Sequence, residues 1–591
     1  MLISDIIADF LKFSGIECVF GIIGSANSRL YHSFTENSIE IINVHNEQSA
    51  VIAAGAYYRT TGKVAIALVT AGGGASNSVT GIVGAWADSI PTLVLSGQEQ
   101  YKYVQEHSLR RMYGTQGFDF PHMVSKTTKY AKTIQTKEEV QDELEKAYSI
   151  MMNGRKGPVL LDIPFEIQGA SIEKRFWNTY IAQECVPSRE NIDIIKQLLR
   201  DSKRPVILAG HGVKLSNSTK VFKEMIENIK APVLLTWSGI DILSNEHPMN
   251  FGRPGVYGQR GANFIQQKCD LLLVLGSRLT LPQSGYNFDE FARNAKIVMV
   301  DIDDTEKKEF VDIFVHGDCK YVIEELKTMK YKNDEWIHLC NTIRDKFPYV
   351  DNTHKEDGFP NSYRIIDKIS EHLKNDQIIV TDMGTALLSG HQAIRLKNNQ
   401  KMFSSYGLGE MGYGLPAAIG ASISSKDKEV LCLNCDGSMM MNLQELQPII
   451  QYNLRVKIVI FNNDGYLMIK HTQDMLFKGK YTAVNKKSGL TLPNYMDLAS
   501  AFGYKGYKIE TWDDFNIKFT EFMEFDGPSI CEIYMHPHQD FIPKVKGVFN
   551  NKTNQIFAPP LEEMSPLLDM NTIKEIMQND ISSYSPDLSR N

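Results

Sequence analysis

The sequence lacks a long apolar run, an excess of basic residues and a basic N-terminal leader. Its hydrophobic stretches fall short of the roughly 20 residues that a membrane-spanning helix requires. The N-terminal segment MLISDIIADFLKFSG carries acidic residues where a secretory signal would be basic. Asp and Glu (70) outnumber Lys and Arg (63), and the net charge of -7 argues against a general affinity for nucleic acid. We therefore predict a cytoplasmic protein without membrane or nucleic-acid partners, in which any anionic ligand is held locally.

Cysteine is also scarce, with 8 among 591 residues, and the cysteines are dispersed along the chain. They have neither the paired spacings of a zinc site nor the density of a disulfide scaffold. One C-x-x-C pair, Cys432 and Cys435, lies along a predicted buried strand instead of opening a helix. A redox role for this pair is therefore disfavoured.

The chain is too long for one hydrophobic core, and short β-branched runs alternate with amphipathic segments from end to end. This alternation is typical of α/β units with parallel sheets. We predict an α/β fold with three parallel-sheet domains at residues 1–170, 188–335 and 355–548, followed by a tail at 549–591. Prolines exclude long helices from the first half of the tail, which either folds over the body or moves as a lid.

Two neighbouring predicted strands of the third block end in polar residues. The stretch EVLCLNCDGSMMMNLQELQPIIQYNLRVKIVIFNN (429–463) contains two apolar runs, which stop at Asp436 and at an asparagine pair. A βαβ unit places such strands side by side, so Asp436 and Asn463 are expected at the same carboxyl edge, where open α/β sheets bind ligands. The segment between them is predicted as a helix, irregular at Pro448, because its apolar residues form one stripe: Leu443, Leu446, Ile449 and Ile450.

A carboxylate and an amide oxygen beside a helix that starts near Ser438 suit a magnesium ion carrying a diphosphate. Mg²⁺ takes oxygen ligands, and a helix N-terminus offers N–H groups to phosphate. The same residue types also occur as ordinary turn residues that end strands. The local chemistry does not choose between these two interpretations.

The stretch resembles the thiamine diphosphate motif, in which G-D-G is followed after a fixed interval by N-N. Asp436 and Asn463 lie 27 positions apart, as that motif requires. From about residue 2 to about residue 550, the chain is similar to the acetohydroxyacid synthase (acetolactate synthase large subunit-like) family of thiamine diphosphate enzymes. The resemblance implies that Asp436, Asn463 and the carbonyl of Gly465 hold Mg²⁺. Cys435 stands where the family has glycine, a small change that we expect the site to tolerate.

The first block resembles the part of the family that binds the pyrimidine ring. In INVHNEQSAV, Glu47 matches the catalytic glutamate that hydrogen-bonds the aminopyrimidine; otherwise a glutamate there is a first-turn carboxylate that interacts with the helix dipole. TAGGGASNSVTG matches the family's T-S-G-P-G-A-T-N, with Gly73 in place of proline. In SYGLGEMGYGLP, Met411 matches the apolar buttress of the bent coenzyme, with core filling as its alternative role.

The resemblance implies a pyrimidine-binding domain, a central Rossmann-like domain and a diphosphate-binding domain. It also implies that the two halves of the coenzyme site belong to different subunits, in a homodimer or homotetramer with active sites at the interface. The residues assigned to coenzyme contacts are Gly24, Gly73, Asn77, Gly384, Thr385, Gly409, Met411, Cys435, Gly437, Ser438, Gly465, Tyr466 and Met468.

The middle block resembles the domain that holds FAD in a non-redox role in acetohydroxyacid synthases. Glycines at strand ends let the backbone approach a phosphate, and Asp301 or Asp303 is suited to accept ribose hydroxyls. No complete G-x-G-x-x-G follows a strand, so an empty nucleotide fold is the alternative. The residues assigned to FAD are Gly210, Gly212, Arg260, Gly276, Arg278, Asp301, Asp303 and Asp318.

Two departures from the family concern the second substrate. An arginine in the family's G-x-R-F-D-D-R holds a second 2-ketoacid and a tryptophan after N-N shapes its pocket, whereas Pro282 and Thr472 stand at these positions. Loss of the guanidinium and the indole favours a larger acceptor without a carboxylate. We predict a carboligase that transfers the acetyl unit of pyruvate to a nucleotide-linked 4-keto deoxysugar. The chain, including its tail PPLEEMSPLL, resembles the flavin-containing carboligases of yersiniose-type sugar biosynthesis.

The alternatives are an acetolactate synthase, a 2-ketoacid decarboxylase that performs no ligation, and a regulatory paralogue without activity. Joint retention of the motif residues named above disfavours the paralogue. Gln116, in GTQGF, is the candidate that orients the donor. Lys470 and His471 are candidates for acceptor binding or proton transfer, with solvated surface as the alternative for this pair. Gln473 is a further candidate near the chemistry.

Overall fold

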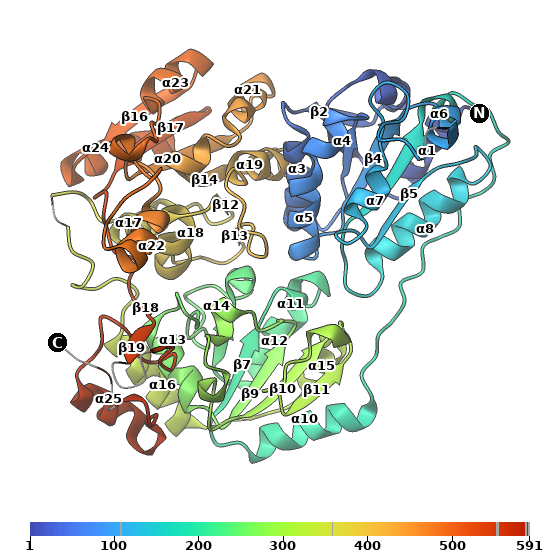
Figure 1. Cartoon of the computed structure of the whole chain (residues 1–591). Helices are drawn as coiled ribbons and strands as arrows, with labels where there is room; N and C mark the ends of the chain where they lie inside the picture. Colours follow the sequence, from blue (N-terminus) through green and yellow to red (C-terminus); the bar gives the residue numbers. More distant parts are fainter. Residues whose placement is uncertain (107–108, 332, 357, 551–554, 586–587, 589–591) are drawn as a thin grey trace. The chain divides into compact units, whose positions relative to one another are not determined.

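The computed structural model describes residues 1–106, 109–331, 333–356, 358–550, 555–585 and 588. Within these residues the structure has three large sheets, and all of their strands run parallel (Figure 1). The α/β fold class predicted from the sequence is therefore confirmed. No helix in these residue ranges combines the length and the apolarity needed to cross a membrane.

The described chain divides into two compact units. The first unit comprises residues 1–183, 377–387 and 401–538, and the second comprises residues 184–376, 388–400 and 539–591 except for the undescribed positions. The first and third parallel sheets belong to the first unit, and the middle sheet belongs to the second. The predicted domain boundaries remain a prediction.

The first sheet has the strand order β2-β1-β3-β4-β6-β5 within the described residues. Its central strands are fully buried, as expected for strands covered on both faces. The sequence runs VAIALVT, TLVLSG and GPVLLDIP correspond to three of these strands. The strands are β1 (Cys18–Gly21), β2 (Glu40–Asn43), β3 (Ile66–Val69), β4 (Leu93–Gln98), β5 (Tyr130–Thr133) and β6 (Val159–Pro164).

The third sheet has the order β13-β12-β14-β15-β17-β16 in the described chain. Its four central strands coincide with apolar runs, whereas the edge strands are short or half exposed and show no such run. Because β14 and β15 pair in parallel, the predicted βαβ unit is confirmed. The strands are β12 (Ile378–Thr381), β13 (Lys401–Phe403), β14 (Val430–Cys435), β15 (Val456–Asn462), β16 (Lys505–Ile509) and β17 (Ser529–Tyr534).

The segment between β14 and β15 differs from the single helix predicted for it. It forms α20 (Asp436–Met439), a 3-10 turn and α21 (Leu446–Gln451). The break occurs at Asn442, whose side-chain amide donates to the carbonyl of Gly412 at 2.8 Å. Pro448 lies in the first turn of α21, where a missing N–H costs no helical hydrogen bond.

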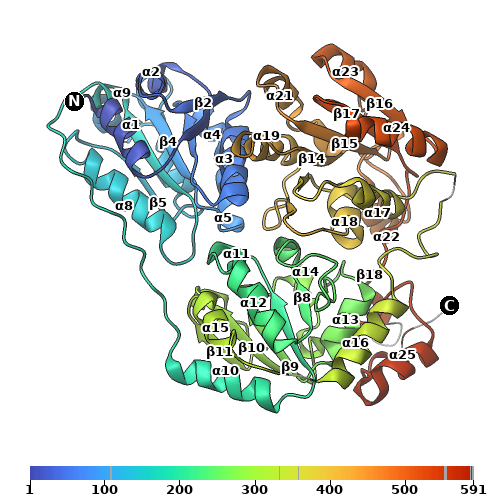
Figure 2. The same cartoon turned by 180° about the vertical axis from the view of Figure 1, so that it is seen from behind.

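The middle sheet, in the second unit, has the order β11-β10-β9-β7-β8 within the described residues. Helices α10, α12 and α15 supply apolar side chains to one core of this unit, and α13 and α16 to the other (Figure 2). The elements are β7 (Pro205–Ala209), β8 (Val233–Leu235), β9 (Leu271–Leu275), β10 (Lys296–Asp301), β11 (Ile313–His316), α10 (Arg189–Asp201), α12 (Thr219–Ile229), α13 (Arg260–Lys268), α15 (Cys319–Leu326) and α16 (Asp334–Lys346).

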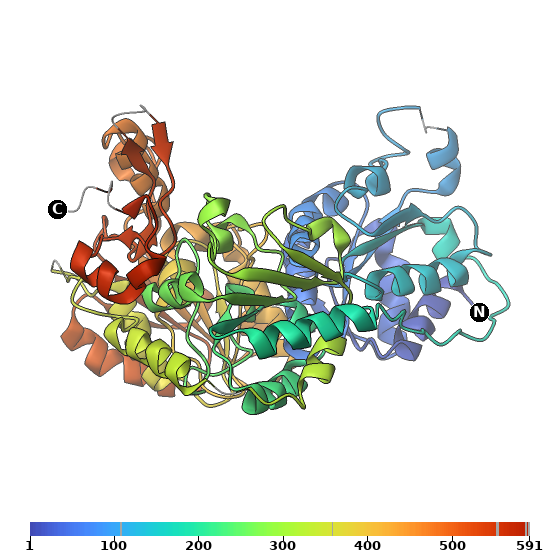
Figure 3. The same ribbon diagram turned by 90° about the horizontal axis from the view of Figure 1, so that it is seen from below.

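The described part of the tail is folded into the second unit. Leu561 and Met564 are buried in the same core as α13 and α16, together with the apolar face of α25 (Met570–Met577). Figure 3 shows the red ribbon of α25 beside the yellow-green helices of this unit. Glu562 is fully buried and its carboxylate lies 2.7 Å from the guanidinium of Arg293. The tail residues 551–554, 586–587 and 589–591 lie outside the described residues.

Two helices form the centre of the first unit. α3 (Glu47–Thr61) packs directly on α19 (Gly414–Ser424), and both are buried around almost their whole circumference. Gly420 permits this contact, since a Cβ atom there would lie 2.0 Å from the carbonyl oxygen of Ala53. Glu47 is the N-terminal residue of α3, so the packing of this helix pair fixes the position of its backbone.

Gly420→Ala is expected to destabilise the first unit by about 1–3 kcal/mol, because the two helices must separate to admit one methyl group. Chemical denaturation followed by circular dichroism measures this loss. Gly55→Ala, also on α3, is the matched control because the nearest atom to its Cβ lies 3.4 Å away. Equal effects of the two substitutions would contradict the importance of the close helix contact.

Candidate active site

The carboxylate of Glu47 lies at the carboxyl edge of the first sheet, as the first residue of α3. Its side chain is buried, with 8% of the residue exposed. Glu47 Oε2 accepts a hydrogen bond of 3.0 Å from the side-chain amide of Asn77, the last residue of α4 (Gly73–Asn77). Glu47 and Asn77, both predicted as site residues, are therefore in direct contact. The Asn77 amide therefore orients the Glu47 carboxylate.

The glycine-rich segment wraps closely around this carboxylate. A Cβ atom on Gly74 would lie 3.0 Å from Glu47 Oε1, and one on Gly24 would lie 2.5 Å from Thr70 Oγ1. Gly72 has φ +68°, a left-handed backbone conformation that favours glycine. The predicted residue Gly73 has open space around it. The close packing thus depends on the glycines before and after Gly73.

Gln116 lies against the same segment. The side chain of Glu99 accepts from the N–H groups of Thr115 and Gln116, at 3.2 and 3.1 Å, and so shapes the turn that carries Gln116. The Gln116 side-chain amide donates to the carbonyl of Ala71 at 3.5 Å. The structure therefore brings together Glu47, Asn77, Gly24 and Gln116, all predicted from the sequence.

Asp436 is the centre of a second cluster, at the carboxyl edge of the third sheet. Its residue is fully buried. One carboxylate oxygen accepts from the N–H groups of Asn463 and Gly465 at 3.0 and 2.9 Å, and the other accepts from that of Gly437 at 2.8 Å. Burial raises the pKa of the Asp436 carboxyl to about 7, although these hydrogen bonds act in the opposite direction.

Asn463 supplies the second polar atom of this cluster. Its Oδ1 atom is buried and has no hydrogen-bond partner among the described residues. Its Nδ2 atom is 3.4 Å from the Thr385 hydroxyl, which accepts from it. A buried amide oxygen without a donor is costly unless a ligand satisfies it. Asp436 and Asn463 therefore fit a hard divalent cation such as Mg²⁺, which takes oxygen ligands.

Several other predicted residues of this half pack close to Asp436. Gly384 has φ +90°, and a Cβ atom there would lie 3.4 Å from the Cys435 sulfur, which accepts from the N–H of Ala386 at 3.3 Å. Gly437 packs on the Tyr466 ring, 2.4 Å from the position of an added Cβ. The Cys435 thiol is therefore accommodated within the cluster, and burial raises its pKa.

Asp382 is a buried carboxylate that the sequence reasoning did not single out. It follows β12 and accepts from the N–H groups of Gly412 and Gly414 at 3.0 and 2.7 Å, so it holds the loop that carries Gly409 and Met411. Burial raises its pKa to about 6. The signal was available, since IIVTD ends an apolar run in aspartate just as EVLCLNCD does.

Glu445 and Asn442 connect residues on either side of Glu47 to the segment after Asp436. Glu445 is fully buried, and its Oε1 atom accepts from the N–H of His45 at 3.0 Å. Asn442 lies 3.4 Å from the Ser49 hydroxyl. Neither residue was predicted, because only the packing of α3 against the third block reveals their partners.

The residues after the asparagine pair occupy α22 (Leu467–Phe477). Lys470 was considered with His471 as a candidate for substrate contact or as solvated surface. The solvated interpretation is wrong for Lys470, which is 1% exposed and donates to main-chain carbonyls of the first unit. His471 and Met468 are partly exposed on the same helix, and the Thr472 hydroxyl donates to the Met468 carbonyl at 3.2 Å.

In the second unit, the glycines predicted to approach a nucleotide approach each other. Gly212 donates its N–H to the Gly276 carbonyl at 2.9 Å, and added Cβ atoms on Gly210 and Gly212 would lie 2.4 and 2.5 Å from Gly276. Gly276 has φ +59°. These contacts bring together the loops that follow the adjacent strands β7 and β9 at one sheet edge.

Asp301 ends β10, Asp303 follows it, and Asp318 follows β11 at the same sheet edge. Asp301 accepts from the N–H of Asp303 at 3.0 Å, and Asp303 accepts from that of Thr305 at 3.1 Å. Asp318 accepts from the N–H of Lys320 at 2.9 Å and so caps α15. Each of these carboxylates thus accepts a hydrogen bond within its own turn at this sheet edge.

The two predicted arginines of this unit differ in their surroundings. The Arg260 guanidinium donates to the carbonyls of Met564 and Pro566 in the tail, at 3.2 and 2.8 Å. Burial lowers its pKa to about 10. Arg278, after β9, is partly buried.

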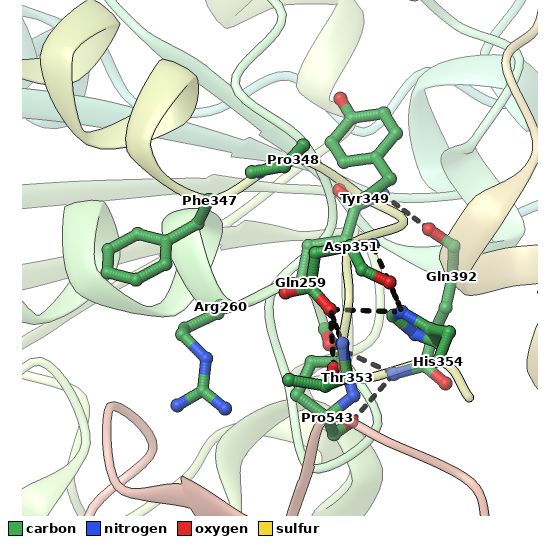
Figure 4. Close-up of a pocket in the computed structure, with 11 residues that line it drawn as sticks. Gln259, Arg260, Phe347, Pro348, Tyr349, Asp351, Thr353, His354, Gln392 and Pro543 are labelled. Atoms are coloured by element: carbon green, nitrogen blue, oxygen red, sulfur yellow. Dashed lines mark hydrogen bonds and ion pairs between the residues drawn. The ribbon is translucent and has the colours of Figure 1, made fainter. Parts of the chain in front are cut away.

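A pocket in the second unit lies at the N-terminal end of α13 (Figure 4). His354 and Asp351 interact within it, with the imidazole Nδ1 atom 3.2 Å from the carboxylate. Gln392 donates to the carbonyls of Gly258 and Pro543. Of the residues predicted for cofactor binding, Arg260 lines this pocket.

Comparison with known proteins identifies the three blocks. Residues 1–121 match the N-terminal TPP binding domain of thiamine pyrophosphate enzymes, residues 192–326 match their central domain, and residues 382–533 match their C-terminal TPP binding domain. Each match contains one of the three parallel sheets wholly or in large part.

Full-length relatives agree with these matches. The chain is 30% identical over 549 residues to the acetolactate synthase isozyme 1 large subunit of Escherichia coli, covering 92% of this chain and 95% of that protein. It is 29% identical over 537 residues to the isozyme 2 large subunit of the same organism (90% and 96%). It is also 29% identical over 560 residues to an acetolactate synthase large subunit of Cyanidium caldarium (91% and 94%). The chain therefore belongs to the thiamine diphosphate-dependent enzymes of the acetolactate synthase family, a family of decarboxylases and carboligases.

Asp162, near the end of β6, supports the turn that carries Gln116. Its raised pKa also predicts how the stability of the protein depends on pH. Its carboxylate accepts from the Gln98 amide at 2.8 Å, and that amide also donates to the Phe118 carbonyl at 3.0 Å. Burial raises the Asp162 pKa to about 7, whereas an unfolded aspartate titrates near about 3.9. Between these values the folded chain retains a proton that the unfolded chain has lost, so this group lowers stability as pH rises.

Asp162→Asn is expected to make the loss of thermal stability between about pH 4 and about pH 7 shallower, because the neutral amide has no charged form to bury. Differential scanning calorimetry of both proteins across this range measures the change. Asp427→Asn, at an exposed loop position, is the control and should leave the pH dependence unaltered. An unchanged slope in Asp162→Asn would contradict the assignment.

Proposed function

We propose that this chain is a thiamine diphosphate- and Mg²⁺-dependent carboligase that decarboxylates pyruvate and transfers the two-carbon acetyl unit to a carbonyl acceptor. The acceptor class that we propose is a nucleotide-linked 4-keto deoxysugar. The observation that carries the cofactor part is the pair formed by the buried Asp436 carboxylate and the unpartnered Asn463 Oδ1 atom. We assign both residues, with the Gly465 carbonyl, to Mg²⁺.

The chain's own residues supply the acid-base and positioning functions. When bound, the coenzyme would supply an electron sink for the carbon that loses carboxylate. Glu47 would hold a proton on the aminopyrimidine, and Asn77 fixes the direction of its carboxylate. Met411 would press on the coenzyme from the loop that Asp382 anchors. Gln116 lies against the glycine segment beside Glu47 and would orient the donor.

Two side chains support the choice of acceptor. Pro282 lies in the short helix α14 (Leu281–Ser284), and proline has no group that could bind a substrate carboxylate. Thr472, on the exposed side of α22, is much smaller than an indole. The relatives named as acetolactate synthases favour the alternative, the joining of two pyruvate molecules. A 2-ketoacid decarboxylase that performs no ligation is the remaining alternative.

FAD in a non-redox role is part of the same proposal. Three features support it: the matching central domain, the converging glycine loops after β7 and β9, and Asp301 and Asp318 at the same sheet edge. Arg278 follows β9 at this edge. The Arg260 guanidinium donates to carbonyls of the tail, so any effect of Arg260 on FAD binding would be indirect, through the tail.

Product analysis tests the acceptor. The purified protein is first examined for the visible absorption of a flavin, with and without added FAD, and is then incubated with pyruvate, thiamine diphosphate and Mg²⁺. We expect a yellow protein that forms little acetolactate alone and a branched sugar once a nucleotide-linked 4-keto deoxysugar is added, detected by mass spectrometry. Efficient acetolactate formation without the sugar would overturn the acceptor assignment, and failure to take up FAD would remove the flavin.

We also propose that the enzyme is a homodimer or homotetramer in which Glu47 of one subunit serves the Asp436 site of another. Glu47→Gln and Asp436→Asn should each be inactive, whereas their co-expressed mixture should recover about one quarter of wild-type activity. The recovery arises because half of randomly mixed dimers contain one site with both native residues. Each variant expressed with wild-type chain is the control for mixing. No recovery in verified mixed dimers would indicate that both residues serve a site within one chain.

A further inference from the structure

Lys470 is a buried cation that contacts the loop between the two proposed metal ligands. It is 1% exposed, and its Nζ atom donates to the main-chain carbonyls of Asn463 and Asp464, each at 2.9 Å, and to that of Pro537 at 3.3 Å. An ammonium group has three N–H donors, so these three carbonyls use all of them. The arrangement leaves no donor of Lys470 for a substrate.

The loop from Asn463 to Gly465 has a demanding backbone conformation. Asp464 has φ +55° and Gly465 has φ +123°. A left-handed conformation is unfavourable for a residue with a side chain, although less so for aspartate. Something must therefore hold this turn in place.

Two sets of contacts hold the turn from opposite sides. The N–H groups of Asn463 and Gly465 point to the Asp436 carboxylate, while the carbonyls of Asn463 and Asp464 point to Lys470. The ammonium group thus fixes the peptide planes on either side of Asp464. These planes determine the direction of the Asn463 side chain and of the Gly465 carbonyl.

We propose that Lys470 is a positioning residue that preorganises the Mg²⁺ ligands of this enzyme. This inference rests on the proposed function, in which Asp436, Asn463 and Gly465 hold the ion. Residues that orient metal ligands typically contribute about 10–100-fold to metal affinity. Lys470 would not contact the ion itself. Loss of its ammonium group should weaken Mg²⁺ binding because the ligand oxygens of Asn463 and Gly465 would no longer be held in position.

A second buried lysine in the third block provides a matched control. Lys457, near the opposite end of β15, is also 1% exposed, and its Nζ atom donates to the main-chain carbonyls of Phe525 and Gly527. Both lysines therefore stabilise carbonyl-rich turns in the core of the third block. Only Lys470 contacts the Asp436 site.

The experiment compares Lys470→Met and Lys457→Met, which keep side-chain length and remove the charge. Mg²⁺ is titrated into the metal-free full-length protein at a fixed thiamine diphosphate concentration, and binding is followed by isothermal calorimetry. We expect Lys470→Met to bind Mg²⁺ at least about tenfold more weakly, and Lys457→Met to bind it within about twofold of wild type. The midpoint temperature of thermal unfolding in EDTA should be lower in both variants than in wild type.

Steady-state kinetics distinguish a positioning role of Lys470 from general damage to the fold. Activity of Lys470→Met should return at high Mg²⁺, so the Mg²⁺ concentration for half-maximal activity changes much more than kcat. If Lys470→Met does not fold, Lys470→Gln, which keeps two donors, should give a smaller weakening in the same titration. Unchanged Mg²⁺ affinity, or equal weakening in Lys457→Met, would overturn the role of Lys470. Wild-type protein that binds no coenzyme with Mg²⁺ would instead refute the proposed function.

Discussion

The contact between the Asp436 carboxylate and the main chain after β15 is the constraint on which the candidate site depends. The carboxylate is fully buried, and the donors that satisfy it are neutral N–H groups. The ionised carboxylate is poorly solvated there, and burial therefore raises the pKa of Asp436 to about 7. A cation at the same point would offset this cost, and the unpartnered Asn463 Oδ1 atom supplies a second ligand for it.

The same physical arrangement recurs elsewhere in the first unit. Asp382 follows β12 and Asp436 follows β14, and each accepts hydrogen bonds from loop N–H groups at the carboxyl edge of its sheet. Asp162 lies in β6 and accepts from the side chain of Gln98 at the end of β4. Parallel strands end at one edge, so a short acidic side chain there can gather loops that are distant in sequence. In this protein the carboxylates thereby organise the segments carrying Met411, Asn463 and Gln116.

Buried lysines perform the complementary task for carbonyl groups. Lys457 and Lys470 lie near opposite ends of β15 and donate to main-chain carbonyls that no strand or helix pairs. A buried ammonium group is unfavourable by itself, but the carbonyl acceptors, two for Lys457 and three for Lys470, compensate for part of its lost hydration. Charged side chains of both signs thus hold the loops around β14 and β15 in one conformation.

Much of the architecture was predictable because central parallel strands are apolar on both faces. The apolar runs at β14 and β15, and the polar residues that end them, predict that Asp436 and Asn463 lie at one sheet edge, as the parallel pairing of these strands confirms. The edge strands β13 and β16 were missed because they are short or alternate between exposed and buried residues, a pattern that loops also show. The break at Asn442 was missed because its cause is the carbonyl of Gly412, which is distant in sequence.

The sequence by itself determined the three parallel sheets and the identity of the groups at their carboxyl edges, since side-chain period and chain order are local properties. Only the tertiary structure decided which groups became partners. Lys470 reads in the sequence as a solvated lysine and is buried in the structure, and the tight packing around Glu47 involves Gly72 and Gly74 and leaves Gly73 open. The physical reason is that burial of a polar group depends on donors and acceptors supplied by other strands and loops, and these positions are defined only once the chain has folded.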